Sequence, residues 1–288
     1  MKKIIILIPI FNDWDSLKKL IFEINRQVKD LTDYLFDCYI INDGSTIKKP
    51  EIIKPESLNS IKILNMRKNK GHARCIAFGI RYINQNMKFD NLILMDGDGE
   101  DRPEEIKSLI DKIESNSKIS VVAKRVKRSE GFLFQLLYKM HKLLTFIFTG
   151  KNINFGNYSC LTKEDVSEIS SKKSLWSSYS GTIKKYINNL SAIDSTRGRR
   201  YFGPSKMSLY NLIIHSFSII AVFKYQVLIR SSILVLTIFY LKSYLGVFTL
   251  IIQIILIIFC ILIFLVSLRE KKKELFISHK NLNNIEDI

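Results

Sequence analysis

The sequence has few glycines, prolines and cysteines for its length. Its 288 residues include 12 Gly, 5 Pro and 4 Cys. These low counts exclude collagen-like repeats, low-complexity disorder and a small fold held by disulfides. The four cysteines form no CxxC pair and have no metal-ligand spacing. We therefore expect them to be reduced and buried, in a part of the chain that faces the cytoplasm; they are Cys38, Cys75, Cys160 and Cys260.

Acidic residues are scarce relative to basic ones. The 27 Asp and Glu residues stand against 44 Lys and Arg, which gives a formal net charge of +17. This surplus suggests an anionic partner, which could be nucleic acid, nucleotide phosphate or a membrane surface. A basic binding protein without catalysis would cluster its Arg and Lys residues with aromatic stacking residues. Here the basic residues spread through helices and the tail, so we expect no nucleic-acid partner.

Long apolar segments are concentrated near the C-terminus. Residues 245–267 form a run of 23 residues whose most polar member is Gln253. At about 1.5 Å per residue this run crosses a hydrocarbon core of about 30 Å. The shorter run 227–241 carries Arg230, which we expect to reach the lipid headgroups. We favour a hairpin of two spans over a single span, with Arg230 and the basic residues after Leu268 on the cytoplasmic side.

The N-terminus resembles a signal peptide but lacks its features. The apolar run after two lysines is only about eight residues long, and a charged segment follows it instead of a small-residue cleavage site. We expect a buried strand over residues 3–8. Four further apolar runs are expected strands: 39–43, 61–66, 92–98 and 119–124. Amphipathic stretches 16–28, 72–84 and 103–113 are expected helices, with Ser16 as an N-cap.

This alternation of strands and helices predicts an α/β fold with a mostly parallel sheet and helices on both faces. We expect four parts: a catalytic domain over 1–198, juxtamembrane amphipathic helices over 199–226, a transmembrane hairpin over 227–268, and a basic cytoplasmic tail over 269–288. Ligands of such sheets bind beyond the carboxyl ends of the strands. Several polar residues fall at strand ends: Asn12, Asp13, Asp43, Asp96 and Asp98.

The most distinctive local signal is the acidic stretch 96–101, which reads DGDGED. Two Asp residues separated by one small residue can direct both carboxylates toward a hard cation, which also bridges substrate phosphates. An EF-hand is excluded, because Asp101 stands where that loop requires Gly and Lys107 where it requires Glu. The chain also lacks a GxGxxG motif after its first strand and a GxxxxGK[ST] loop. A nucleotide would therefore be held by carboxylates, a metal and Arg or Lys.

Taken together, several motifs resemble those of family 2 glycosyltransferases with the GT-A fold. In chain order they are Ile8–Asp13 (IPIFND), Ile41–Ser45 (INDGS), Asn69–Ala73 (NKGHA), Met95–Asp98 (MDGD) and Arg102–Glu104 (RPE). Two later segments, Val122–Arg128 (VAKRVKR) and Arg200–Met207 (RYFGPSKM), resemble the dolichol-phosphate mannosyltransferase and bactoprenol glucosyltransferase branch. In that branch juxtamembrane helices and a C-terminal membrane hairpin follow the catalytic domain.

The resemblance implies roles for residues at the matching positions. Pro9, Phe11 and Asp13 would line the pocket for the base and ribose, and Asp43 would bond the base. Asp96 and Asp98 would hold Mg²⁺ or Mn²⁺ against the diphosphate of a nucleotide-sugar. Arg125 and Arg128 would grip phosphate, because guanidinium groups match its oxygens. Ser205 and Lys206 would suit a lipid phosphate or simply attract anionic headgroups. For Arg125 and Arg128 the alternative is a solvated basic loop.

The chain departs from the family pattern at two places. The acidic motif continues as Gly99-Glu100 where relatives often have Leu-Gln, and Gly156-Asn157-Tyr158-Ser159 stands where Gly-Asp-Phe-Arg is usual. A polyprenyl phosphate acceptor needs no strong base, whereas a sugar hydroxyl needs a carboxylate within about 3 Å. Glu100 and Asp101 are candidates for that base, and Asp98 and Arg125 for catalytic contacts.

We therefore expect a multi-pass enzyme of the cytoplasmic membrane whose catalytic domain faces the cytoplasm. It would transfer a sugar, with inversion, from a UDP- or GDP-sugar to a polyprenyl phosphate. The alternative acceptor is a hydroxyl of a lipid-linked glycan. Membrane lipids are expected contacts, and a homo-oligomer is compatible with the sequence, which leaves the oligomeric state open.

Overall fold

The computed structural model describes residues 1–115, 119–127, 132–204 and 208–288. Within these ranges one sheet of eight strands runs in the order β7-β5-β6-β4-β1-β2-β3-β8. The strands are β1 (Lys2–Ile10), β2 (Tyr34–Asn42), β3 (Ser60–Met66), β4 (Asn91–Leu94), β5 (Ser120–Lys127), β6 (Phe155–Thr162), β7 (Leu190–Thr196) and β8 (Leu282–Asp287).

The sheet is mixed, which corrects the expectation of a mostly parallel one. In the described part of the chain, four neighbouring pairs are parallel and three are antiparallel. The parallel core β4-β1-β2-β3 comes from the βαβ pattern read in the sequence. The antiparallel pairs all involve β6 or β8, which lie outside that pattern.

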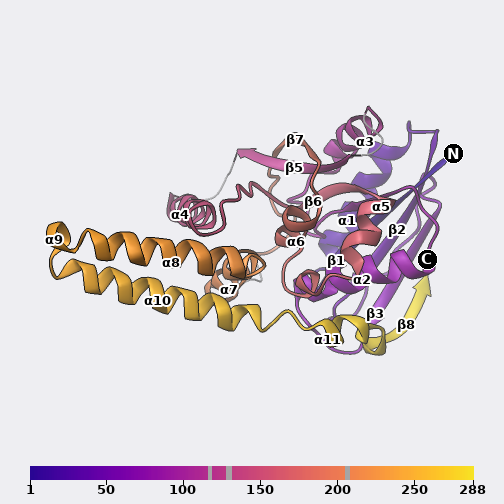
Figure 1. The fold of residues 1–288 in the computed structure, drawn as a ribbon. Helices are drawn as coiled ribbons and strands as arrows, with labels where there is room; N and C mark the ends of the chain where they lie inside the picture. Colours follow the sequence, from indigo (N-terminus) through magenta and orange to yellow (C-terminus); the bar gives the residue numbers. More distant parts are fainter. Residues whose placement is uncertain (116–118, 128–131, 205–207) are drawn as a thin grey trace.

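Helices cover both faces of the sheet (Figure 1). On one face α1 (Trp14–Val28) and α3 (Ile106–Glu114), which follows the short helix η1 (Pro103–Glu105), pack on the even-numbered residues of β1. On the other face α2 (His72–Asn86), α5 (Lys163–Ser170), the short helix η2 (Lys173–Trp176) and α6 (Tyr179–Tyr186) pack on the odd-numbered ones. Alternate side chains of a strand point to opposite faces. Residues 4–8 of β1 are therefore completely buried.

All eight elements expected from the first 125 residues are present, with shifted ends. β2 begins five residues earlier than expected, at Tyr34, and β4 ends at Leu94, before the acidic stretch. Helix α1 begins at Trp14, after Asp13, so Ser16 is buried inside the helix and is not its N-cap. Cys38, Cys75 and Cys160 are buried and Cys260 is partly exposed, and all four are free thiols.

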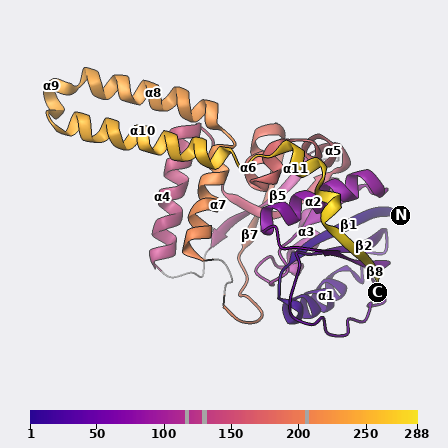
Figure 2. The ribbon, with the colours of Figure 1, turned by 90° about the horizontal axis from the view of Figure 1, so that it is seen from below.

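A helical hairpin projects from the sheet domain (Figures 1 and 2). It consists of α8 (Lys224–Tyr240), the short α9 (Lys242–Leu245) and α10 (Phe248–Ser267), and α8 and α10 lie side by side. Helices α4 (Phe132–Thr149) and α7 (Leu209–Ala221) contact each other and the hairpin. Among the described residues, one helix, which begins at Phe248, is long and apolar enough to cross a membrane. Helices α7 and α8 would form a second span only if the two together count as one broken helix, bent by 86° between them.

Arg230 is an exposed residue of α8 that contacts the C-terminal end of α4. Its Nη1 donates to the carbonyl oxygen of Ile147 at 3.2 Å, and its guanidinium packs over Gly150. Ile147 lies in the last turn of α4 and Gly150 follows the helix, and the unpaired carbonyl groups at such a helix end favour a cation. Arg230 therefore joins the hairpin to α4.

The C-terminal segment returns to the sheet after α10. Helix α11 (Lys272–Phe276) and the short helix η3 (Ser278–Asn281) lead into β8, which pairs antiparallel with β3. In Figure 1 this yellow segment lies along the edge of the sheet domain. The residues expected to form a basic tail thus provide the last strand of the sheet.

Candidate functional site

The acidic side chains expected at strand ends lie at one edge of the sheet. β4, β1 and β2 are parallel neighbours, so their carboxyl ends point the same way. Asp13 follows β1, Asp43 follows β2, and the acidic stretch follows β4. The backbone N–H of Asp43 also donates to the carbonyl oxygen of Ile10 at 2.9 Å. The topology therefore brings these acidic side chains to one edge of the sheet, as their positions at strand ends predicted.

Asn12 connects the loop after β1 to the loop after β2. It has a positive φ of 52°, a conformation that Asn tolerates better than most residues. Its Oδ1 accepts from the backbone N–H groups of Thr46 at 2.8 Å and Ile47 at 3.0 Å. Its own N–H donates to the hydroxyl of Ser45 at 2.8 Å. These bonds fix the loop that carries Phe11, which is 38% exposed, and Asp13.

Asp43 fixes the start of helix α2. Its carboxylate accepts from the backbone N–H groups of Lys70 at 2.9 Å and Gly71 at 2.8 Å. Burial raises the pKa of Asp43, and these two hydrogen bonds oppose the rise. Asp43 is only 3% exposed. It is therefore a buried link between the end of β2 and the start of α2. Its contact with a base stays a prediction.

Asp96 lies in a polar network with His72 and Asn157. The amide of Asn157 donates to Oδ1 of Asp96 at 3.1 Å and lies 2.8 Å from Nε2 of His72. The same Nε2 is 3.3 Å from Oδ1 of Asp96. Burial opposes ionisation of Asp96, but His72, Arg125 and Asn157 together hold its pKa well below the ordinary value. His72 thus lies beside Asp96 in this network.

The acidic stretch contains two further carboxyl groups with raised pKa values. Burial, followed by repulsion from Asp96 and Glu100, raises the pKa of Asp98 to about 6. Burial and repulsion from Asp96 raise the pKa of Asp101 to about 7. Asp101 is almost fully buried and accepts from the backbone N–H of Asp96 at 2.9 Å. Burial and repulsion from neighbouring carboxylates thus favour the protonated forms of Asp98 and Asp101.

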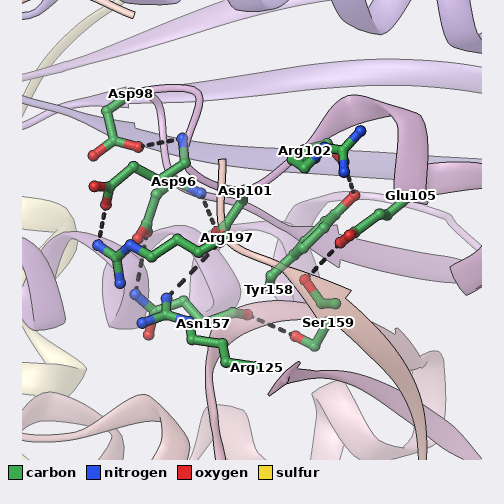
Figure 3. Close-up of polar contacts among 12 residues, drawn as sticks. Asp96, Asp98, Asp101, Arg102, Glu105, Arg125, Asn157, Tyr158, Ser159 and Arg197 are labelled. Carbon is green, nitrogen blue, oxygen red and sulfur yellow. Dashed lines mark hydrogen bonds and ion pairs between the residues drawn. The ribbon is translucent and has the colours of Figure 1, made fainter. Parts of the chain in front are cut away.

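Arg125 faces this cluster from β5 (Figure 3). Its Nη2 lies 3.9 Å from Oδ1 of Asp101. The guanidinium also packs directly over Gly156 on β6, where an added Cβ would lie 2.6 Å from Nη2. Gly156 therefore leaves the room that Arg125 needs beside the acidic stretch. Phosphate binding by Arg125 remains a prediction.

The loop 197–203 covers the acidic stretch. Backbone N–H groups of Gly198 and Tyr201 donate to the carbonyl oxygens of Glu100 at 2.8 Å and Asp98 at 2.9 Å. The Tyr201 ring lies against Gly99, whose φ of +86° and lack of a side chain allow this contact.

Two arginines of this loop pair with acidic side chains. Arg200 pairs with both Asp98, at 2.8 Å, and Asp13, while Arg197 pairs with Glu100. The sequence did not predict that either arginine contacts the acidic stretch. The only available signal was that Arg200 opens the motif RYFGPSKM.

Asp96 and Asp98 are candidate ligands for a divalent cation that would also bind a phosphate. Among the described residues, no three His, Cys, Asp or Glu side chains are grouped to hold a metal. Mg²⁺ usually takes one or two carboxylates together with substrate phosphates and water. Asp96 and Asp98 supply hard oxygen ligands of this kind, and the raised pKa of Asp98 indicates charge that a cation would neutralise.

Two cavities border the edge. A larger one, of about 650 Å³, is lined by residues that include Asn12, Asp13, Trp14 and Phe202. A smaller one, of about 190 Å³, is lined by Asp43, residues of α2 and the C-terminal segment. Pro9 is buried at the end of β1. Arg128, Ser205 and Lys206, which were expected to bind phosphate, lie outside the described residues.

A family model described as Glycosyl transferase family 2 matches residues 5–175. The undecaprenyl-phosphate 4-deoxy-4-formamido-L-arabinose transferase of Photorhabdus laumondii is 27% identical over 222 residues, which are 74% of this chain and 65% of that relative. The transferase of the same name from Yersinia enterocolitica is 27% identical over 223 residues, with the same coverage. The chain thus spans 65% of the length of these relatives.

Solved structures show a similar fold. Glucosyl-3-phosphoglycerate synthase from Mycobacterium tuberculosis, in complex with Mn²⁺, UDP-glucose and phosphoglyceric acid, has a TM-score of 0.53 and 14% identity, covering 78% of this chain and 80% of that chain. Mannosyl-3-phosphoglycerate synthase from Rubrobacter xylanophilus has a TM-score of 0.54 and 11% identity, covering 77% and 72%. At these identities the likeness concerns the fold alone, and it agrees with the expected GT-A architecture.

Proposed function

Because the chain belongs to glycosyl transferase family 2, we propose that it transfers a sugar from a nucleotide-sugar to a polyprenyl phosphate, with inversion at the anomeric carbon. The observation that carries this proposal is the position of the site next to apolar helices. Burial, followed by the neighbouring His72 and His141, lowers the pKa of His215 on α7 to about 4, and Asp96 opposes this shift. Helix α4 contacts α7 and α8 and leads into β6, which carries Gly156 and Asn157 of the site, and α7 also contacts α10.

This position suits an acceptor with a phosphate head and an apolar chain. Helix α4 exposes large apolar side chains close to the hairpin: Leu136, Met140, Leu143 and Phe146. A polyprenyl chain could lie along these surfaces while its phosphate reaches Arg125. The names of the relatives, which are undecaprenyl-phosphate transferases, support the same acceptor class.

The state of the carboxylates favours a phosphate acceptor over a sugar hydroxyl. A hydroxyl needs a carboxylate base within about 3 Å, but Glu100 is paired with Arg197 and Asp101 is almost fully buried. A polyprenyl phosphate is already anionic near pH 7. Its oxygen forms the new bond to the anomeric carbon while the bond to the nucleoside diphosphate breaks, and no proton has to be removed.

The donor would lie along the sheet edge, with its base toward Asp43 and its diphosphate toward the acidic stretch. Asp96 and Asp98 would hold Mg²⁺ or Mn²⁺, which neutralises the charge on the departing diphosphate. Arg125 would orient the phosphate of the acceptor through its planar guanidinium. Pro9, Phe11 and Asp13 would line the base and ribose pocket. Arg128, Ser205 and Lys206 remain proposed phosphate contacts on sequence grounds alone.

We further propose that the hairpin α8–α10 inserts into the cytoplasmic membrane with the sheet domain in the cytoplasm. Helix α10 supports this by its length and apolar surface. The basic residues Arg269, Lys271, Lys272 and Lys273, which follow it, would be retained on the cytoplasmic side.

The test is incubation of the purified protein, in lipid nanodiscs, with radiolabelled UDP- or GDP-sugars and undecaprenyl phosphate. We expect one donor to give a labelled lipid that mild acid hydrolyses, since a sugar phosphodiester of this kind is acid-labile. Label that appears only in an acid-stable glycan would favour the hydroxyl acceptor. If no donor gives any labelled lipid, the proposal is wrong.

A further inference from the structure

The smaller cavity has the C-terminal segment as one of its walls. Its volume is about 190 Å³, below the roughly 300–1,000 Å³ of pockets that hold whole drug-sized ligands. It therefore has room for one ring system of a larger ligand. Its other walls are the end of β2, the start of α2 and η2. The lining residues that matter here are Asp43, Arg74, Trp176, Ser278, Lys280 and Asn281.

Hydrogen bonds hold the C-terminal segment, which forms one wall of the cavity, in place. The backbone N–H of Arg67 donates to the carbonyl oxygen of Asn281 at 2.7 Å, and the side-chain amide of Asn281 donates to the carbonyl oxygen of Lys68 at 2.9 Å. Beyond it β8 pairs with β3, and Lys62 forms an ion pair with Asp287 at 2.7 Å. The guanidinium carbon of Arg81 lies 4.1 Å from the ring centroid of Phe276. The wall is thus part of the folded domain.

The cavity combines flat side chains with both donors and acceptors. Arg74 lies 5.9 Å from the ring centroid of Trp176 and donates to the carbonyl oxygen of Lys70 at 2.8 Å. Within the described part of the chain, no hydrogen bond occupies the Ser278 hydroxyl, the Lys280 ammonium or Oδ1 of Asn281. These three groups offer both donors and an acceptor to a ligand.

This chemistry fits a nucleobase better than a phosphate. Three cationic and two anionic side chains line the cavity, whereas a phosphate site would concentrate cations: Lys70, Arg74 and Lys280 against Asp43 and Glu274. A nucleobase has a flat face that stacks on aromatic and guanidinium groups, and an edge that carries both donors and acceptors. The cavity also includes Asp43, which lies at the ligand edge of the sheet.

We propose that the C-terminal segment completes the nucleobase subsite, so that Ser278, Lys280 and Asn281 help to determine which nucleotide the protein accepts. The inference rests on the proposed nucleotide-sugar donor. It assigns a specificity role to residues that follow the membrane hairpin in the chain and join the sheet domain through β8.

The test measures equilibrium binding of UDP, GDP and pyrophosphate, each with Mn²⁺, to the full-length protein in nanodiscs. The variants are Lys280→Ala and the double variant Ser278→Ala/Asn281→Ala. We expect the wild type to prefer one nucleoside diphosphate, and each variant to reduce that preference by about three- to tenfold for each hydrogen bond lost. Pyrophosphate has no base, so its affinity is expected to stay within about twofold of that of the wild type.

Asn283→Ala is the matched control, because Asn283 lies in the same segment but outside the cavity. It is expected to bind all three ligands as the wild type does. If the wild type binds nucleoside diphosphates and the cavity variants keep its preference, the inference is wrong while the proposed function stands. Equal loss of affinity for pyrophosphate in the variants would mean a structural role and would also overturn the inference. If the wild type binds no nucleoside diphosphate, both proposals fail.

Discussion

Arg200 donates from Nη1 to Oδ2 of Asp98 at 2.8 Å, although 102 positions separate the two residues in the chain. The same guanidinium pairs with Asp13, so one side chain joins the loop after β1 to the acidic stretch after β4. Arg200 is therefore placed where it can compensate the charge of Asp98 and contact the diphosphate of a donor.

The first prediction concerns this arginine. Replacement by Ala removes both ion pairs, and we expect kcat/KM for the nucleotide-sugar to fall at least tenfold. Arg200→Lys should recover only part of the loss, because a single ammonium cannot reach two carboxylates as a planar fork does. Arg102→Ala is the control, since the one ion pair of Arg102 within the described residues is with the exposed Glu104, at 3.5 Å. Wild-type kinetics for Arg200→Ala would contradict the assigned position.

The second prediction concerns the divalent cation. Asp96→Asn and Asp98→Asn should each reduce turnover by more than about a hundredfold, because each removes a negatively charged oxygen ligand. Titration calorimetry of UDP and GDP with and without Mn²⁺ provides the measurement. We expect Mn²⁺ to strengthen nucleotide binding in the wild type and to have no effect in the variants. Glu104→Gln changes a nearby exposed carboxylate and should behave as the wild type. If a variant keeps the Mn²⁺ effect, the residue that it replaces is not a ligand in the proposed metal site.

The third prediction is a pH dependence of stability that arises from Asp101. Its pKa is about 7 in the folded protein against an ordinary value of 3.8, so the folded state binds the proton more tightly than the unfolded state. Stability is therefore lost as the pH rises from about 4 to about 7, at up to about 1.4 kcal/mol for each pH unit. Asp101→Asn has no proton to lose and should escape this decline.

Thermal unfolding in the presence of EDTA checks this expectation. The Tm of Asp101→Asn should equal that of the wild type near pH 4 and exceed it by several degrees at pH 8. Asp111→Asn provides the control, because Asp111 lies on the exposed side of α3. A constant difference between Asp101→Asn and the wild type across this pH range would mean that burial of a charge is not the cause.

The sequence predicted well which acidic residues lie at one edge of the sheet, because those signals are local. Apolar runs and the residues that follow them identified β1, β2 and β4, and parallel pairing then brought Asp13, Asp43 and Asp96 together. Strand β8 could not be predicted in this way. Its sequence, LNNIED, is polar and has no apolar run, and it is a strand because it pairs with the free edge of β3.

The contacts that complete the site were missed for a related reason. The ion pairs of Arg200 link residues 102 and 187 positions apart, and no local pattern reports such a distance. His72 was in a recognised motif, yet its contact with Asp96 depends on where the start of α2 lies relative to the acidic stretch. Its location in the site follows from the packing of elements and not from its neighbours in the sequence.

The fourth prediction links Gly156 to Arg125. A methyl group at position 156 would lie 2.6 Å from Nη2 and 3.0 Å from Cζ of Arg125. Because an arginine side chain is flexible, Gly156→Ala should displace the guanidinium without unfolding the domain, and kcat should fall about tenfold or more while Tm changes little. Arg125→Ala should have a similar effect. The double variant should lose no more than either single variant, because both act through the same guanidinium. If the two losses multiply in the double variant, Gly156 does not act through Arg125.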